Sequence, residues 1–164
     1  MRIALISDTH GLIPDDVLPY LRKCDEVWHA GDIGDIGAMA QIPDERRRHW
    51  VWGNIDDHRI RQSTQEYDFF EIEGVRTLII HIGGYPGRYQ QKARLLIEDL
   101  NPDLFISGHS HILKIMRDHQ NGLIHFNPGA CGFKGFHKKR TFIRFDINTG
   151  KIENVEVIEL SRHK

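Results

Sequence analysis

Length, composition and charge exclude several classes of protein at once. The chain has 164 residues, of which 40% are hydrophobic, and 22 Lys and Arg against 23 Asp and Glu give a net charge of −1. These values fit a single globular domain over 1–164 with a buried core, without the basic excess typical of nucleic-acid binders. No apolar run is long enough for a signal peptide or a membrane span, and two distant cysteines make no disulfide framework. We therefore expect a cytoplasmic protein that binds neither membranes nor extended nucleic acid.

The first third of the chain alternates short apolar runs with helix signals. Strands are expected at 2–7, 26–29 and 48–52. Helices are expected between them, at 14–23 and 37–41. This alternation indicates βαβ units and a largely parallel sheet.

The remainder of the chain is dominated by hairpins. Strand pairs with a turn signal between them are expected at 67–72 with 75–80, 112–117 with 123–126, and 141–146 with 151–158. Between the first two pairs we expect a loop at 83–87, a helix over 89–100 and a strand at 104–107. The basic run Lys138–Arg140 is interpreted as solvated loop charge. The whole pattern predicts an α/β domain with two packed sheets and helices outside.

Side chains that can bind metals follow the ends of these predicted strands. They are Asp8, His10, Asp32, Asn54, His81, His109 and His111. Ligands bind at the carboxyl ends of strands in α/β sheets, so these distant segments can deliver their side chains to one place. A mixture of imidazole, carboxylate and amide suits Mn, Fe, Zn, Co or Ni better than Mg or Ca. We expect two divalent cations about 3.5–4 Å apart, a spacing that clamps the oxygens of a phosphoryl group.

Each of these residues has a plainer interpretation when taken alone. Asp8 could cap a helix or form a turn, and Asp32 and Asn54, which follow glycines, could be turn residues. Their joint placement at strand ends favours the ligand interpretation. The other histidines of uncertain role are interpreted as surface or core residues: His49, His119, His125, His137 and His163.

The order of these motifs resembles a known family. Asp-Thr-His at 8–10, Gly-Asp at 31–32, Gly-Asn at 53–54, His81 and Gly-His-Ser-His at 108–111 follow the order of the calcineurin-like metallophosphoesterase superfamily. The segments ISDTHG, HAGDI, SGHSH and NPGA resemble its small YfcE-type branch of phosphodiesterases.

The resemblance implies a fold and a ligand assignment. The fold would be a four-layer α-β-β-α sandwich of two mixed sheets, and manganese or nickel the preferred metal. One metal would be held by Asp8, His10 and His111, the other by Asn54, His81 and His109, with Asp32 bridging both.

Two positions depart from the family pattern. Many superfamily members carry a proton-donating His after the Asn ligand, where this chain has Ile55. His58 is close in sequence and could substitute, so the catalytic candidates are Asp32, Asn54 and His58. The second departure is Gly83, which stands where the branch has a second His.

Four further residues are expected around the cage. His29 and Asp56 would orient ligands through hydrogen bonds, with a plain turn role equally open for Asp56. Arg88 could contact a phosphate oxygen, with a solvated role equally open. Asn127 lies in the NPGA motif and is expected to support the site or touch substrate.

The residues and the resemblance together predict a metal-dependent phosphodiesterase or phosphatase, and the resemblance favours a phosphodiesterase that hydrolyses small phosphodiesters with a metal-activated water. A metal-dependent nuclease is disfavoured by the near-neutral charge and the short chain. The alternative is a non-catalytic metal-binding or protein-interaction scaffold of the same fold, and a retromer subunit of this fold has a scaffold role. Ile55 and Gly83 motivate this alternative, because each stands where the family pattern has an imidazole. The resemblance also implies a homodimer or larger homo-oligomer.

Overall fold

The first of two five-stranded sheets holds the N-terminal strand at its centre. The computed structural model describes residues 1–162, so His163 lies outside the described residues. The strand order is β12-β11-β1-β2-β3, with β1 parallel to β2 and antiparallel to β11. The bounds are β1 Arg2–Ile6, β2 Glu26–His29, β3 Arg47–Trp50, β11 Lys139–Asn148 and β12 Lys151–Ser161.

The second sheet is also mixed. Its order is β4-β5-β8-β10-β9, where β5, β8 and β10 are parallel and the outer strands pair antiparallel to their neighbours. The bounds are β4 Tyr67–Ile72, β5 Val75–Ile80, β8 Leu104–Ile106, β9 Leu113–Asp118 and β10 Leu123–Pro128.

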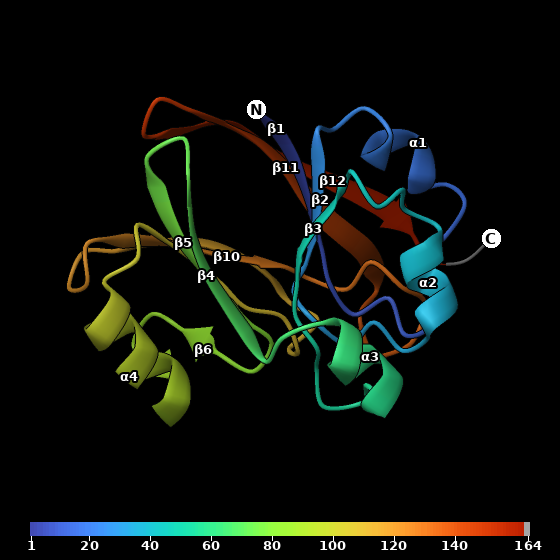
Figure 1. Ribbon diagram of the computed structural model, residues 1–164, viewed down its shortest axis with the longest axis horizontal. Coiled ribbons are helices and arrows are strands. Elements are labelled where there is room, and N and C mark those ends of the chain that lie inside the picture. The colour runs from blue at the N-terminus through green and yellow to red at the C-terminus, as the bar shows by residue number, and fades with distance from the viewer. Residues whose placement is uncertain (163–164) are drawn as a thin grey trace.

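Helices cover the outer face of each sheet, as Figure 1 shows. α1 (Leu18–Leu21), α2 (Ile36–Ala40) and α3 (His58–Ser63) pack against the first sheet, and α4 (Gln91–Leu100) packs against the second. This is the predicted four-layer α-β-β-α sandwich of two mixed sheets, and that prediction is confirmed.

The alternation of β1 shows why the layers assemble in this way. Ala4 and Ile6 join the cluster under the helices, whereas Ile3 and Leu5 join the cluster between the two sheets. Successive side chains of a strand point to opposite faces, so an uninterrupted apolar run can fill two cores at once. The five strands whose ends carry predicted ligands are β1, β2, β3, β5 and β8.

Four local expectations are wrong, each for a physical reason. The helix expected at 14–23 is limited to Leu18–Leu21, because Pro19 has no N–H and fits only in a first turn. The loop expected at 83–87 contains a small hairpin, β6 (Gly84–Tyr85) with β7 (Arg88–Tyr89), whose Pro-Gly centre suits a tight turn.

Helix α3 was not expected from the sequence. Only Ile60 in it is buried, so it has no apolar periodicity, and the Asp57 side chain caps it by accepting from the Arg59 and Ile60 N–H groups. The basic run is also not uniformly solvated, because Arg140 is buried and pairs with Asp16. Within 1–162, no helix has the length and apolar character needed to cross a membrane.

Candidate metal centre

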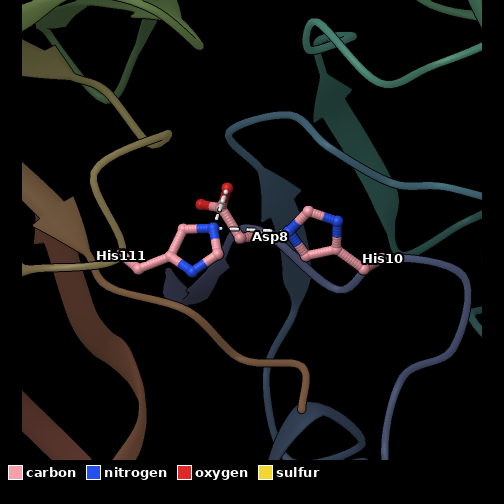
Figure 2. Close-up of side chains that lie close together, drawn as sticks. All are labelled: Asp8, His10 and His111. Carbon is pink, nitrogen blue, oxygen red and sulfur yellow. Dashed lines mark hydrogen bonds and ion pairs between the residues drawn. The ribbon is translucent and has the colours of Figure 1, made fainter. Parts of the chain in front are cut away.

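Three side chains from the ends of β1 and β8 converge in a first group. Figure 2 shows Asp8, His10 and His111 facing one another. The His111 Nε2 atom lies 3.2 Å from Asp8 Oδ1 and 3.3 Å from His10 Nε2. Donor atoms that share one cation at bond lengths of about 2.0–2.2 Å lie roughly 3 Å apart. The group therefore has the spacing of a metal site, as well as the donor types.

A second group forms beside it from the ends of β2, β5 and β8. Asp32, His81 and His109 bring one donor atom each to within 4.8 Å of the others. The His81 Nε2 atom lies 3.1 Å from Asp32 Oδ1, and both side chains are almost fully buried. Asn54 lines a cavity together with His81. The structure thus brings six of the seven predicted ligands into two groups of three and places Asn54 at the edge of the second.

Buried atoms without partners show that these residues fit a cation. Asp8 Oδ1 and His81 Nε2 are both buried, and neither makes a hydrogen bond within the described part of the chain. A buried polar atom without a partner costs about 1–3 kcal/mol, so proteins seldom leave one unsatisfied. One such atom in each group, aimed at the other donor atoms, is what a bound cation would satisfy.

Hydrogen bonds on the far side of two rings select the tautomer that binds metal. The His81 Nδ1 atom lies 2.7 Å from the Ala30 carbonyl oxygen, which can only accept, so Nδ1 carries the proton and Nε2 is bare. His111 Nδ1 lies 3.3 Å from Nδ1 of His137, whose Nε2 is 3.0 Å from the Gly132 carbonyl oxygen. The same logic places the His137 proton on Nε2, so its Nδ1 accepts from His111. The His111 Nε2 atom is then bare and faces the first group.

The Asp8 carboxylate is held in place by its second oxygen. Oδ2 accepts from the Ser7 hydroxyl at 2.6 Å and from the His109 backbone N–H at 3.2 Å. These bonds leave Oδ1 directed at the first group. They also tie the β1 loop to the β8 loop, so the two ligand groups are mechanically connected.

Backbone strain is concentrated in the same residues. Ten non-glycine residues of the described chain have positive φ, and five of them are predicted ligands: Asp8, His10, Asp32, His109 and His111. The left-handed region disfavours most side chains, and such strain gathers at functional sites. Glycines allow the crowded approach, since a Cβ on Gly53 would lie 2.0 Å from Asp32 Oδ1 and one on Gly108 would lie 2.2 Å from Ser7 Oγ.

Asp56, Asn127 and His29 connect the loops that carry the ligands. The buried Asp56 carboxylate accepts from the backbone N–H groups of Ile33, Gly34 and Gly53 at 2.6–3.1 Å, which joins the β2 loop to the β3 loop. Asn127 Nδ2 donates to the Gly108 carbonyl oxygen at 2.9 Å.

His29 lies beneath the cage and is fully buried. Its Nδ1 accepts from Gly31 N–H, which leaves Nε2 to donate to Thr9 Oγ1 at 2.9 Å. Burial lowers the pKa of His29 to about 3, so the ring is neutral and acts as a fixed support.

The carboxylates around the second group stabilise positive charge there. Burial alone would raise the pKa of Asp32, but the adjacent His81 brings it below its ordinary value. Burial alone would lower the pKa of His81, but Asp32 and Asp8 raise it above 6.5. A cation at this group competes with a proton for His81 Nε2, so we expect metal affinity to fall as the pH falls.

The remaining sequence candidates lie at different distances from the cage. Arg88 lines a cavity with His109 and Asn127. His58 is exposed at the start of α3, and its proposed proton-donor role stays a prediction. Ile55 is 47% exposed beside Asn54. At Gly83 a Cβ would lie 2.6 Å from the Phe105 ring, so close packing explains why this position carries no imidazole.

Sequence reasoning missed one residue, His137. The sequence predicts a surface or core histidine at this position, yet His137 hydrogen-bonds His111 and lines a cavity with it. Gly132 and Gly135 precede His137 in its loop, and a Cβ on Gly135 would lie 2.2 Å from His111 Nδ1. The Gly-rich composition indicates that this loop packs closely against another part of the chain, but it does not identify the residues that the loop contacts.

The fold and the two ligand groups define a metallophosphoesterase-type domain. The model of the calcineurin-like phosphoesterase superfamily domain matches residues 1–150, and the chain belongs to this family. A probable metallophosphoesterase of Methanothermobacter thermautotrophicus is 33% identical over 137 residues, which cover 79% of this chain and 77% of the relative.

Solved structures support the same fold. Vps29 of Entamoeba histolytica, solved in complex with zinc, matches with a TM-score of 0.75 at 19% identity, covering 99% of this chain and 100% of that one. The phosphoesterase Yfce of E. coli matches with a TM-score of 0.62 at 17% identity, covering 95% and 98%. At these identities the likeness concerns the fold alone.

Proposed function

We propose that the protein is a phosphodiesterase that hydrolyses small phosphodiesters at a binuclear metal centre, with manganese the first candidate metal and nickel, iron, zinc or cobalt the others. The observation that carries the proposal is the pair of adjacent ligand groups, each with a buried, unpartnered donor atom. Two bound cations would polarise the phosphate and supply a hydroxide-like water at neutral pH. The proposal places the reaction in the cytoplasm, in keeping with the two free, buried cysteines.

The chain's own residues would hold this arrangement with little reorganisation. Ala30 and His137 keep two imidazoles in the tautomer that presents Nε2. Asp32 and Asn54 come from neighbouring loops that Asp56 fixes together. Groups that the fold already holds in place cost no rearrangement at the moment of reaction.

The test is hydrolysis of bis-p-nitrophenyl phosphate with and without added manganese. We expect manganese to stimulate turnover in the native protein, and Asp32→Ala and His109→Ala to abolish it. Asp99→Ala and His119→Ala are matched controls, because both side chains are exposed and lie on α4 and after β9, away from the ligand groups.

Native protein loaded with manganese, zinc or nickel that hydrolyses neither this diester nor p-nitrophenyl phosphate would contradict the proposal. Loss of activity in the control variants would show that the assay reports folding instead of the site.

A protein-interaction scaffold is the second candidate, and an apolar rim favours it. Large apolar side chains near the predicted ligands are exposed by 40% or more: Leu12, Ile55, Ile82, Ile112 and Phe136. Exposed apolar groups around a site indicate contact with a partner or with an apolar part of a ligand. Metal analysis with the turnover assay separates the two candidates, because a metal-free, inert protein with a stable partner is expected only of the scaffold.

A further inference from the structure

The metal centre opens onto three cavities with different charges. The largest of them, about 460 Å³, is lined by Ile112 and Phe136 with His109 and His111, and it carries no Lys, Arg, Asp or Glu. A second, of about 410 Å³, lies beside Asn54 and His81 and contains Arg61 and Lys92. A third, of about 280 Å³, lies beside His109 and Asn127 and contains Arg88 and Lys114.

The cations of the Asn54 cavity are already engaged. Arg61 donates through Nε to the Asp56 carbonyl oxygen at 2.8 Å, and its guanidinium lies 4.2 Å from the centre of the Trp52 ring. Lys92 Nζ lies 2.6 Å from Glu66 Oε1. This cavity therefore offers little uncompensated positive charge to a ligand.

The cations of the His109 cavity differ in this respect. No carboxylate lines the cavity, and within residues 1–162 neither Arg88 nor Lys114 forms an ion pair. Lys114 Nζ lies 4.4 Å from the centre of the Tyr85 ring, a position that holds the ammonium group without neutralising it. Two cations that share a cavity without a counterion attract an anion.

The walls of this cavity are fixed to the metal centre. Arg88 pairs with Tyr85 across the β6–β7 hairpin, which is held by the Gln90 N–H bond to the Gly83 carbonyl oxygen and by the Ser107 hydroxyl bond to the Gly84 carbonyl oxygen. Lys114 lies opposite Asn127 on paired strands, so their side chains share one face of the sheet.

Asn127 completes the connection between this wall and the metal centre. It bonds both the Gly108 carbonyl oxygen and the Ser110 hydroxyl in the loop that carries His109 and His111. The cavity is therefore held at a fixed position relative to the second ligand group.

From this geometry we infer that the cavity is a subsite for a second anionic group of the substrate. The substrate class is a phosphoester that carries, beyond the phosphate on the metals, another phosphate or a carboxylate held by Arg88 and Lys114. The inference rests on the proposed function in treating the bound phosphoester as a substrate, but the binding that it describes requires no turnover.

The test compares ligands that cannot be hydrolysed and that differ by one charge group. Isothermal titration calorimetry of the zinc-loaded protein would compare propylphosphonate with propane-1,3-bisphosphonate, and pentylphosphonate with pentane-1,5-bisphosphonate. The two chain lengths cover different distances between the metals and the cavity. We expect at least one bisphosphonate to bind about tenfold more tightly than its monophosphonate, because one added charge-assisted hydrogen bond contributes about that much affinity.

The variant Arg88→Gln with Lys114→Gln is expected to remove this preference, so that each bisphosphonate binds about as tightly as its monophosphonate. Its matched control is Arg94→Gln with Lys151→Gln, which removes one Arg and one Lys that are exposed and line no part of the cavity. No preference at either length, or a preference that survives in the double variant, would overturn the inference. Hydrolysis of bis-p-nitrophenyl phosphate reports on the proposed function separately.

A carboxylate in place of the second phosphonate distinguishes the two anions. If 4-phosphonobutanoate binds more tightly than propylphosphonate and loses that advantage in the double variant, the subsite accepts carboxylates as well as phosphates. If only the bisphosphonates gain, the substrate class narrows to molecules with two phosphates.

Discussion

Replacing His137 should weaken metal binding although His137 is not itself a predicted ligand. In His137→Ala the Nδ1–H of His111 loses its acceptor, so the ring can place its proton on Nε2 or turn away from Asp8. One neutral hydrogen bond is worth about 1 kcal/mol, and partners of ligating histidines contribute about 10–100-fold in metal affinity. We therefore expect affinity at the first group to fall by about tenfold.

Isothermal titration calorimetry with manganese or zinc measures the metal affinity of the two ligand groups. We expect the affinity of the first group to fall and that of the second to stay the same. Two further variants separate positioning from packing. In His137→Asn the side-chain Oδ1 falls close to where Nδ1 stood and should restore most of the affinity, whereas His137→Leu fills the space without an acceptor and should not. His119→Ala is the matched control at an exposed position.

The spectroscopic counterpart is the protonation pattern of the His111 ring in the zinc-loaded protein, read from long-range proton–nitrogen NMR spectra. We expect a proton on Nδ1 and the metal-bound nitrogen at Nε2. Unchanged affinity in His137→Ala, or an Asn variant that behaves like the Leu variant, would refute the proposed role of His137 in selecting the tautomer.

Three further predictions concern stability. Burial lowers the pKa of His125 from 6.5 to about 4, so the unfolded chain binds a proton more readily and stability falls as the pH drops from about 6.5 towards 4. At about 1.4 kcal/mol per pKa unit the loss reaches roughly 3 kcal/mol. Urea unfolding of His125→Phe across this range should show a shallower loss than the native protein, and an equal slope would contradict the assignment. Gly83→His should lower the midpoint of thermal unfolding, because its Cβ would lie 2.6 Å from the Phe105 ring; an unchanged midpoint would show that the hairpin yields. Manganese at 100 times its dissociation constant should add about 2.7 kcal/mol to the unfolding free energy for each site that it occupies. Differential scanning calorimetry of Asp8→Ala should show the loss of one such increment, that of the first group.

The sequence predicts the strand framework well because burial on two faces leaves a simple pattern. The hairpin of β4 and β5 is found at the predicted residues, with alternate burial along β4. The gathering of ligands follows from the same framework, because parallel strands bring their carboxyl ends to one edge. Position along a strand therefore predicts the gathering within each sheet. Asp8 follows β1 of the first sheet and His111, 103 residues later, follows β8 of the second, so their meeting also depends on how the two sheets pack.

Contacts made by loops could not be predicted in this way. Nothing in the pattern of 132–140 distinguishes Arg140, which is buried against Asp16 and the Phe133 ring, from the exposed Lys138 and Lys139. The contact between His137 and His111 could not be predicted for the same reason. The conformation of a loop depends on the side chains that it contacts elsewhere in the fold, and a loop has no sequence periodicity from which these contacts could be predicted.

The candidate metal centre is best understood as a site whose geometry is fixed by the fold. Five predicted ligands hold a strained backbone conformation, and strain of this kind persists only where neighbouring structure fixes it. The fixing groups are not ligands: Asp56 joins two loops, Asn127 holds a third, and His137 and the Ala30 carbonyl orient the rings. Since the folding free energy of the sandwich keeps these loops in place, metal binding need not order them. On the proposed function, specificity among phosphoesters arises beyond the ligands, in the cavity walls, where charge separates the Arg88 side from the apolar Phe136 side.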